Sequence, residues 1–442
     1  MRIEGINKVC FVGAGTMGCF NSLVSAIAGY DAYLYDLYEE ALNASEERQR
    51  EWGAVLVEMG FASEVAVQEG LARITRTSDA TVAAVNADLL SESVFEQLEL
   101  KRETHRKFEK LLPRHAIMTT NTSSILLSDI EPVVDHGDRF AAMHFHQPTR
   151  LVDLVAGPRT RPETIDTLSR FVRSQNQVQI VLKKENPGYI HNNLYGSLLE
   201  TSLLLLHIQA GTVEEIDRAW MLNQRSYGEN ASALGERGNG PFGLIDFVGL
   251  DVVHDVTVAA VEKAQQGGEA LHEQKMAITT AIITTLRDMM NQGELGMKAG
   301  KGFYSYPDPE FWQPEFLEGA TENKTLSDPI INGILKQAIL LVADGVCDVE
   351  DVDLSWMLTH SPTIGPFGIM DDRGIDLVTG QLKDQAVFLT AVFGEDDPDL
   401  DELKRATDYL DALIDKGILG KKSGRGFYEY PDPVYTKPDF LL

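Results

Sequence analysis

The sequence has little cysteine and no long apolar run. Its three cysteines, Cys10, Cys19 and Cys347, lie far apart in a chain of 442 residues. They are too few and too scattered for a disulfide framework or a zinc site. The most apolar stretch, residues 203–208, is bounded by Glu200 and is much shorter than the ~20 residues that cross a bilayer. The sequence therefore predicts neither a disulfide-stabilised fold nor a membrane span.

Positive charge is also scarce. Lysine and arginine number 39 against 67 aspartates and glutamates, which gives a formal net charge of −28. A field of that sign repels phosphate backbones and anionic lipid, so we expect no nucleic-acid partner and no membrane partner. Glu4 lies near the start of the chain and a strand pattern follows it, unlike a secretory signal. We expect a soluble, cytoplasmic protein.

Short apolar runs alternate with helical patterns in the first part of the chain. The hydrophobic content of 43% and charged content of 24% are ordinary globular values. This alternation predicts an α/β domain with a doubly wound parallel sheet. The predicted strands are residues 9–12, 32–35, 74–77, 87–90, 116–119, 141–145 and 178–182.

A glycine turn follows the first predicted strand and precedes a helical pattern. Gly13 permits the tight turn, Gly15 lets the backbone approach a pyrophosphate, and Gly18 lets helix and strand pack closely. The phosphates would lie at the helix N-terminus, beside Thr16 and Met17. The turn therefore predicts a dinucleotide site, and the alternative is a glycine-rich turn without a ligand.

The second predicted strand ends at Asp36. A carboxylate at this place accepts hydrogen bonds from a ribose diol and repels a 2′-phosphate. With the strand, the helix and the acid all in place, we expect the cofactor NAD rather than NADP.

Five further motifs resemble segments of the L-3-hydroxyacyl-CoA dehydrogenase family, in particular its 3-hydroxybutyryl-CoA dehydrogenases. With the glycine turn they stand in the family's order along the chain, and the last of them ends at Asp251. They are Ser-Glu-Ser-Val-Phe-Glu at 91–96 with Lys101, Asn-Thr-Ser-Ser at 121–124, His-Phe-His-Gln-Pro at 144–148, Pro-Gly-Tyr-Ile-His-Asn at 187–192, and Gly-Pro-Phe-Gly-Leu-Ile-Asp at 240–246 with Val-Gly-Leu-Asp at 248–251.

The resemblance implies an enzyme of fatty acid metabolism. Such an enzyme oxidises a 3-hydroxyacyl thioester, most simply a short-chain L-3-hydroxyacyl-CoA, to the 3-oxoacyl form with NAD. The resemblance also implies that Glu96, Lys101 and Asn121 lie at the cofactor. The substrate partner is therefore a small acyl thioester.

Oxidising a secondary alcohol requires a base, a hydride acceptor and donors for the carbonyl oxygen. His144 ends a predicted strand, at the edge where ligands gather, and a histidine can take the proton. Asp153 can orient this histidine and stabilise its imidazolium form. Ser123 and Asn192 can hydrogen-bond the substrate oxygen.

Two further histidines are weaker candidates. His146 and His191 can touch substrate, but packing explains them equally well. His144 and His146 share one face of a strand, which suits two metal ligands. The sequence indicates no third ligand, so we expect no metal site.

The chain also departs from the family pattern. The family usually has Phe at the position of His146, Asn at Gln147 and Glu at Asp153, with a longer loop before that acid. Residues 39–69 hold eight glutamates and only two basic residues, so they lack lysines for the phosphates of coenzyme A. Two alternatives therefore stay open. One is a dehydrogenase of a free hydroxy acid, of the gulonate or carnitine type, and the other is a non-catalytic NAD(H)-binding module.

The second half of the chain repeats the motifs of its middle, which predicts two copies of a helical domain. We expect an NAD-binding domain at 1–186, a first helical domain at 187–315 and a second at 316–442. We also expect the copies to pack together, which favours a monomer with an internal pseudo-dimer over a homodimer. Residues 293–304 recur as 417–428, 306–309 as 430–433, 240–243 as 365–368, and 220–222 as 356–358.

Overall fold

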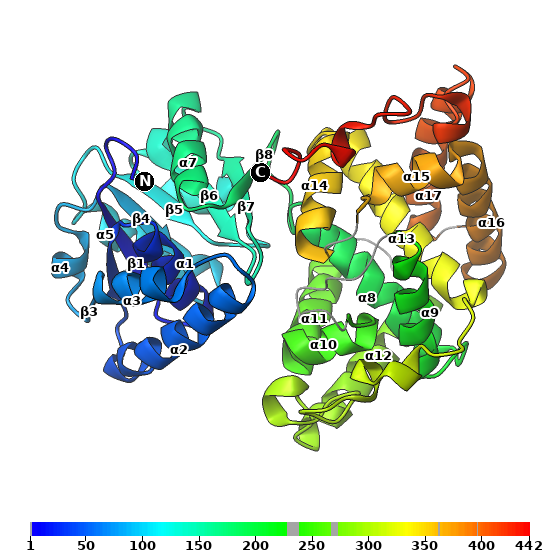
Figure 1. Cartoon of the computed structure of the whole chain (residues 1–442), viewed down its shortest axis with the longest axis horizontal. Coiled ribbons are helices and arrows are strands. Elements are labelled where there is room, and N and C mark those ends of the chain that lie inside the picture. Colours follow the sequence, from blue (N-terminus) through cyan, green and yellow to red (C-terminus); the bar gives the residue numbers. More distant parts are fainter. Residues whose placement is uncertain (1, 228–237, 267–272, 361–362, 396) are drawn as a thin grey trace. The chain divides into compact units, whose positions relative to one another are not determined.

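The computed structural model describes residues 2–227, 238–266, 273–360, 363–395 and 397–442 (Figure 1). They form two compact units. The first consists of Met1–Tyr189, Gly345–Asp351 and Leu441–Leu442, and the second of Ile190–Asp344 and Val352–Phe440.

The first unit is built on an eight-stranded sheet with the order β3-β2-β1-β4-β5-β6-β7-β8. All neighbouring strands are parallel except β6 and β7. The strands are β1 (Lys8–Val12), β2 (Asp31–Tyr35), β3 (Ile74–Thr77), β4 (Leu89–Glu92), β5 (Ile117–Thr120), β6 (Phe140–Phe145), β7 (Leu151–Ala156) and β8 (Val178–Leu182).

The doubly wound, mostly parallel sheet is confirmed, but the sequence predicted no strand at β7, which pairs antiparallel with β6. Only residues 146–150 join β6 to β7. A parallel pair needs a crossover of about a dozen residues or more, so this short connection can only make a hairpin. The hairpin sets Asp153 directly opposite His144.

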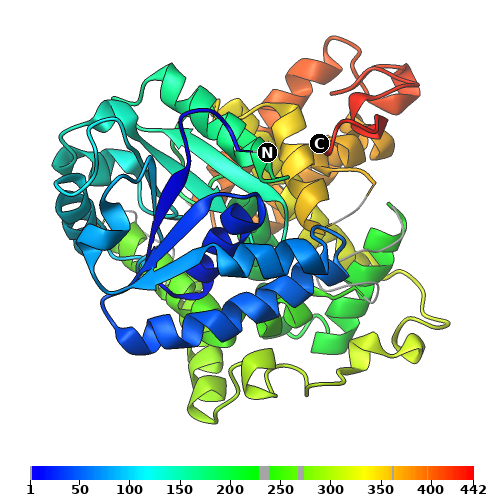
Figure 2. The same cartoon turned by 60° about the vertical axis from the view of Figure 1, so that its left-hand side comes forward.

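Helices cover the sheet of the first unit, whose colours run from blue through cyan to blue-green at α7 and β8 in Figures 1 and 2. Helix α7 begins with a proline, which fits the first turn of a helix, and packs on β6, β7 and β8. The helices are α1 (Thr16–Ile27), α2 (Glu39–Glu58), α3 (Glu64–Ala72), α4 (Ala80–Ala84), α5 (Leu98–Glu109), α6 (Leu127–Ile130) and α7 (Pro162–Ser174), with 3₁₀ turns at Glu131–Val133 and Gly137–Arg139.

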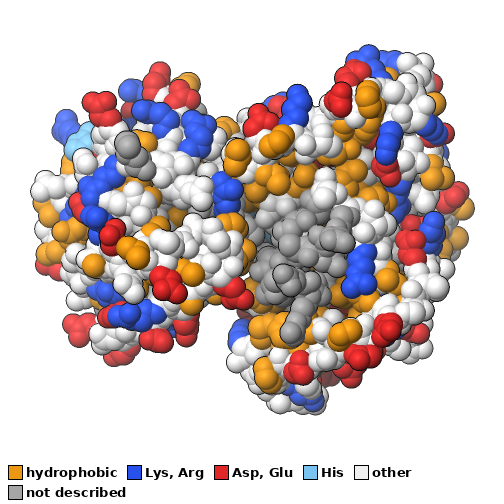
Figure 3. Space-filling view, in the orientation of Figure 1, with side chains coloured by type: hydrophobic (Ala, Val, Ile, Leu, Met, Phe, Trp, Pro, Cys, Tyr) orange, Lys and Arg blue, Asp and Glu red, His pale blue; other side chains and the backbone are white. Residues whose placement is uncertain are grey.

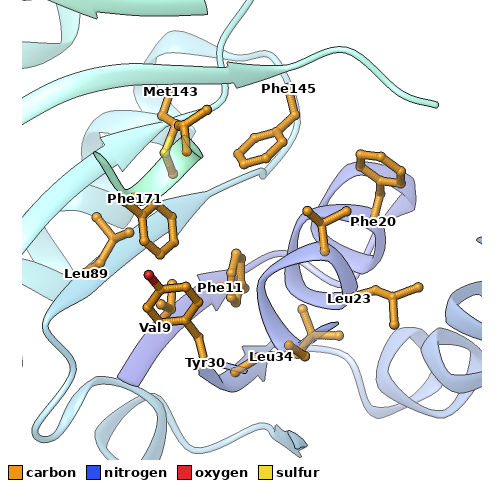
Figure 4. Close-up of a cluster of buried hydrophobic side chains, with 14 of the residues drawn as sticks. Val9, Phe11, Phe20, Leu23, Tyr30, Leu34, Leu89, Met143, Phe145 and Phe171 are labelled. Atoms are coloured by element: carbon orange, nitrogen blue, oxygen red, sulfur yellow. The ribbon is translucent and has the colours of Figure 1, made fainter. Parts of the chain in front are cut away.

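Alternate residues of β6 and β7 lie in the hydrophobic core of this unit, so their polar residues lie on the opposite face of the sheet. Met143 and Phe145 of β6 lie in the apolar cluster that Phe11, Phe20 and Phe171 also join (Figure 4). Successive side chains of a strand point to opposite faces. The residues between the core positions of β6 therefore lie on the other face of the sheet. The same alternation holds on β7, where the residues on either side of Asp153 belong to the core.

The second unit is helical. Its helices are α8 (His191–His207), α9 (Val213–Arg225), α10 (Pro241–Val248), α11 (Leu250–Gln266), α12 (Glu273–Asn291), α13 (Lys324–Ala343), α14 (Val349–His360, which begins in the first unit), α15 (Pro366–Arg373), α16 (Ile375–Phe393) and α17 (Pro398–Ile414). Its 3₁₀ turns are Met297–Ala299, Glu310–Trp312, Pro314–Phe316, Lys421–Ser423 and Val434–Thr436.

The repeated motifs make the same hydrogen bonds twice. Asp217 accepts hydrogen bonds from the backbone N–H groups of Phe242 and Gly243, at 2.9 and 3.1 Å, and from the Tyr304 hydroxyl at 3.0 Å. A Cβ at Gly240 would collide with this aspartate. The corresponding donors to Asp353 are Phe367, Gly368 and Tyr428. In both segments the motifs thus hold a helix N-terminus and a tyrosine against a buried carboxyl group.

Helices of the two repeated segments pack together within the second unit. Helix α13 packs on α8 and α9, and the Trp220 and Trp356 rings meet edge-on with centroids 6.3 Å apart. Among the described residues, α13 is the one helix long and apolar enough to cross a membrane, and 67% of that stretch is buried inside the protein. That burial is typical of a core helix. The predicted boundary at 315/316 falls inside this unit, and the division into two helical domains stays a prediction.

The negative charge does not gather in one place on the face that Figure 3 shows. Acidic side chains there are interspersed with lysine and arginine over both units. The acidic side chains that give the net charge of −28 therefore form no single acidic patch on that face.

Candidate active site

The glycine turn between β1 and α1 has the conformation that its sequence predicts. Gly13 has a φ of +102°, and a Cβ there would lie 2.6 Å from the carbonyl oxygen of Ser93. A Cβ at Gly18 would collide with the Gly13 carbonyl. Both positions therefore require glycine, the first for the turn and the second for the close packing of helix on strand.

The N-terminus of α1 is exposed and unobstructed at Gly15 and Thr16. A Cβ at Gly15 would meet nothing within 4 Å in the described protein, and Gly15 and Thr16 are exposed. Among the described residues no side chain caps this helix, and its first turn, which begins with Thr16 and Met17, carries no acidic residue. A helix start of this kind suits the pyrophosphate of a dinucleotide.

Asp36 lies beside the same turn. Its Oδ2 accepts a hydrogen bond from the Ala14 N–H at 2.7 Å, and its Oδ1 accepts one from the Tyr38 N–H at 3.0 Å. Arg48 of α2 donates to the Ala14 carbonyl at 3.1 Å. The sequence analysis missed this arginine because it lies in a charge run that is typical of a solvated helix.

A buried ion pair joins the end of β4 to helix α5. Lys101 is 1% exposed, and its ammonium lies 2.9 Å from Glu92 Oε1 and 3.2 Å from Glu96 Oε2. The His105 ring lies 3.3 Å from Glu92. Burial alone would raise the pKa of Glu92, but Lys101 and His105 outweigh it and hold that pKa at about 2. The carboxylate of Glu92 is therefore ionised.

Glu96 holds the turn that follows β5. Its Oε1 accepts hydrogen bonds from the Thr122 hydroxyl at 2.5 Å, from the Ser123 N–H at 3.0 Å, and from both the N–H and the hydroxyl of Ser124. Burial raises the pKa of Glu96, but Lys101 and these hydrogen bonds lower it further than burial raises it. In the structure Glu96 and Lys101 thus support the Ser123 turn, and their contact with the cofactor stays a prediction.

Asn121 ties three elements together. Its Oδ1 accepts hydrogen bonds from the Asn21 side chain of α1, at 3.2 Å, and from the Phe145 N–H of β6, at 3.0 Å. In the part of the chain that the structure describes, the neighbouring Ser123 hydroxyl makes no hydrogen bond and is half-buried. Asn121 thus fixes the end of the strand that carries His144.

Three side chains meet on the face of β6 and β7 that points away from the core. His144 and His146 are 7% and 8% exposed, and Asp153 is fully buried. His146 Nε2 lies 2.7 Å from Asp153 Oδ2 and 3.1 Å from His144 Nδ1. His144 Nδ1 itself lies 3.7 Å from Asp153 Oδ2, which is longer than a hydrogen bond. The structure brings the predicted pair together, but with His146 nearer to both partners.

Burial and charge act on the pKa values of this group in opposite directions. Burial lowers the pKa of His144, and the neighbouring His146 lowers it further, while Asp153 acts against both. Burial raises the pKa of Asp153, but His146 and His144 outweigh it, so the net shift is downward. The group is thus a neutral His144 beside an ionised aspartate near neutral pH.

Two more features bear on this group. Tyr189 is buried with its ring centroid 5.3 Å from that of His144, and its hydroxyl donates to the Thr122 carbonyl at 2.9 Å. The sequence analysis noted this tyrosine only as part of a motif. The donor atoms of His144, His146 and Asp153 also lie within 4.8 Å of one another, so β7 supplies the third potential metal ligand that the sequence did not indicate.

Two predicted residues belong to the second unit. His191 and Asn192 open α8, and the His191 ring lies against Tyr195 and His360 with centroids 5.5 and 5.4 Å away. Asn192 is half-buried. Its contact with the substrate stays a prediction.

The family comparison covers most of the chain. The NAD-binding domain of 3-hydroxyacyl-CoA dehydrogenase matches residues 8–185. The C-terminal domain of the same family matches residues 188–306 and 328–430. The mitochondrial hydroxyacyl-coenzyme A dehydrogenase of Homo sapiens is 27% identical over 309 residues, which are 68% of this chain and 91% of the relative.

Solved structures agree. A diketoreductase is 29% identical with a TM-score of 0.58, and the match covers 69% of this chain and 100% of that one. The 3-hydroxybutyryl-CoA dehydrogenase of Escherichia coli K12 shares the fold at 19% identity, with a TM-score of 0.71 over 93% of this chain and 99% of that one. The glycine turn, the His144 strand and these matches together assign the chain to the 3-hydroxyacyl-CoA dehydrogenase family, as an NAD-dependent oxidoreductase.

Proposed function

We propose that this enzyme oxidises a short-chain L-3-hydroxyacyl-CoA to the 3-oxoacyl form, with His144 as the base. The observation that carries the proposal is the position of His144 at the carboxyl end of β6, the edge of the sheet at which the glycine turn also lies. Its Nε2 makes no hydrogen bond in the described part of the protein, so that nitrogen is available to a substrate hydroxyl.

The chemistry follows from these positions. His144 Nε2 takes the hydroxyl proton as the carbon–oxygen double bond forms. The turn at Gly13 and Gly15, with Asp36 beside it, would hold NAD, which would supply the acceptor for the hydride that leaves the same carbon. The carboxylate of Asp153 stabilises the imidazolium form of His144 by its charge, at the 3.7 Å given above. The Ser123 hydroxyl donates a hydrogen bond to the substrate oxygen.

A specific observation favours a second candidate, a dehydrogenase of hydroxy acids that carry no coenzyme A. Residues 39–69, which form most of α2 and α3, hold eight glutamates and only Arg48 and Arg50 as basic residues. They present little positive charge for the phosphates of coenzyme A. The diketoreductase relative acts on dicarbonyl compounds. Free acids of the gulonate or carnitine type are substrates of this second class.

The test is a panel of substrates followed by NADH absorbance. It contains 3-hydroxyacyl-CoA thioesters of several chain lengths, the corresponding free 3-hydroxy acids, and a control without substrate. Turnover of a short-chain thioester supports the first candidate, and turnover of the free acids alone supports the second. NAD binding without turnover of either class would indicate a non-catalytic module. His144→Ala in the same panel identifies any background activity.

We also propose that the protein is monomeric and cytoplasmic. The contact between α8 and α13 and the meeting of Trp220 with Trp356 support the first part, because the two repeated segments already cover each other within one chain. The cytoplasmic location rests on the sequence alone. Light scattering that finds an obligate dimer would contradict the monomer.

A further inference from the structure

We infer that His146 is a positioning residue of the catalytic group, which holds Asp153 beside His144 because this aspartate is too short to reach the base itself. The inference rests on the proposed role of His144 as the base. It gives a function to a histidine that the sequence analysis could not separate from ordinary packing.

Asp153 lies too far from His144 for a direct hydrogen bond. Asp153 faces His144 directly across the two strands, yet its Oδ2 stays 3.7 Å from His144 Nδ1. A hydrogen bond between these atoms needs about 2.9 Å. His146 Nε2 lies within hydrogen-bond distance of both, at 2.7 and 3.1 Å. The one N–H at this nitrogen donates to the ionised Asp153, so His146 holds the carboxylate whose charge acts on His144, and the His144 ring lies against that donor.

The gap between Asp153 and His144 matches the length of one methylene group. The family pattern has glutamate at the position of Asp153 and phenylalanine at the position of His146. Aspartate is shorter than glutamate by one methylene, about 1.5 Å of reach. That difference is enough to close the gap between 3.7 Å and a hydrogen bond. The shorter acid and the additional imidazole are thus two changes that compensate each other.

Hydrogen bonds within the hairpin fix the backbone of His146. The His146 N–H donates to the Leu151 carbonyl at 3.1 Å, and the His146 carbonyl accepts a hydrogen bond from the Thr149 hydroxyl at 2.7 Å. The same hydroxyl accepts the Leu151 N–H at 3.2 Å. These hydrogen bonds close the turn of the hairpin next to His146. The two histidine rings meet edge-on at 82°, with centroids 4.3 Å apart. His146 thus limits how the ring of His144 can turn.

The experiment restores the family pattern one residue at a time. His146→Phe leaves Asp153 without its nearest partner, and we expect kcat to fall by about 10- to 100-fold, as for other supporting residues. Asp153→Glu alone pushes a longer acid against His146, and we expect a fall of similar size. His146→Phe/Asp153→Glu lets the longer carboxylate reach His144, and we expect it to recover about tenfold or more over His146→Phe.

A second measurement separates positioning from mere packing. The titratable groups that act on His144 are His146, Asp153 and Glu96. The pH at which His144 titrates, followed by NMR of its ring protons, should rise in His146→Phe because a neighbouring imidazole that lowers the His144 pKa is lost. It should rise further in the double variant, where a carboxylate makes direct contact. This titration needs no turnover, so it tests the inference even if the substrate class proves wrong.

His115→Phe is the matched control. It removes another histidine–aspartate contact of the first unit, at 3.0 Å from Asp88, but on a ring that is 65% exposed. It should change neither kcat nor the titration of His144. If His146→Phe does not fold, His146→Gln takes its place. Unchanged kcat and an unchanged His144 titration in the His146 variant, or a double variant no better than His146→Phe, would overturn the inference.

Discussion

Asn121 holds the Phe145 N–H at 3.0 Å and so fixes the last residue of the strand on which His144 lies. The same amide oxygen also accepts a hydrogen bond from Asn21 of α1. The helix that begins at the glycine turn and the strand of the base are therefore joined through one side chain. Asn121 therefore supports both the helix at the proposed NAD site and the strand that carries the proposed base.

Asn121→Ala should weaken this support. The buried Phe145 N–H would lose its partner, at a cost of about 1–3 kcal/mol, so we expect the free energy of unfolding in urea to fall by that amount. We also expect kcat to fall, because His144 would shift. A variant as stable and as fast as the parent would show that water or another group replaces the amide.

His144→Ala should slow hydride transfer by about 100- to 10,000-fold, the usual range for a lost acid–base group. NAD binding should survive, because the glycine turn and Asp36 keep their contacts. Single-turnover absorbance gives the rate, and fluorescence titration gives the NADH affinity. A parent-like rate would require another base.

Asp36 should make NAD(H) bind at least tenfold tighter than NADP(H), about 1.4 kcal/mol. Arg48 offers a matched comparison because it contacts the same turn at Ala14. Asp36→Ser should reduce the preference, whereas Arg48→Ala removes a cation and should leave it intact or increase it. Calorimetric titration with both cofactors measures the ratio, and equal affinities in the parent would contradict the role of Asp36.

Zinc ions should inhibit the enzyme. The donor atoms of His144, His146 and Asp153 lie 3.1, 2.7 and 3.7 Å apart, close to the ~3.3 Å expected between ligands of a tetrahedral zinc with bonds of about 2.0–2.1 Å. An ion bound to His144 Nδ1 would leave the ring hydrogen on Nε2, and that nitrogen could then not accept the substrate proton. We expect one equivalent of Zn²⁺ to bind by calorimetry, EDTA to restore activity, and Asp153→Asn to lose the binding. Binding that Asp153→Asn leaves unchanged would place the metal elsewhere.

The second unit should lose stability as the pH rises. Burial raises the pKa of Asp217 from 3.8 to about 7, and hydrogen bonds from Phe242, Gly243 and Tyr304 only partly oppose this. A carboxyl group whose pKa is raised by folding stabilises the fold fully below its unfolded pKa. This contribution is lost as the pH rises towards and through about 7.

Asp217→Asn isolates this effect because an amide does not titrate. The difference in unfolding free energy between the parent and Asp217→Asn should move in favour of the variant from pH 5 to pH 8. Denaturant titration at several pH values measures it. A difference that does not change with pH would mean that Asp217 stays ionised throughout.

The sequence predicted those parts of the site that depend on local chain geometry. The glycine turn and Asp36 follow a strand at fixed spacing, and the roles of Gly13 and Gly18 could be derived from backbone sterics alone. The position of His144 followed in the same way from the end of a buried strand.

The remaining contacts depend on register and on side-chain length. Asp153 could be matched to a motif, but its distance from His144 depends on a hairpin that was not predicted and on one missing methylene. The place of His146 between them depends on the same register. Asn121 and Arg48 act through partners far away in sequence, Asn21 and Ala14, which no spacing pattern indicates.

The meeting of Trp220 and Trp356 inside one unit also has a consequence for how the protein responds to dilution. When two matching surfaces belong to separate molecules, their association depends on protein concentration. When one chain carries both, the encounter is intramolecular and its effective concentration is set by the connecting chain. The paired helices around α8 and α13 should therefore stay together at any protein concentration, including those at which a two-chain assembly would dissociate.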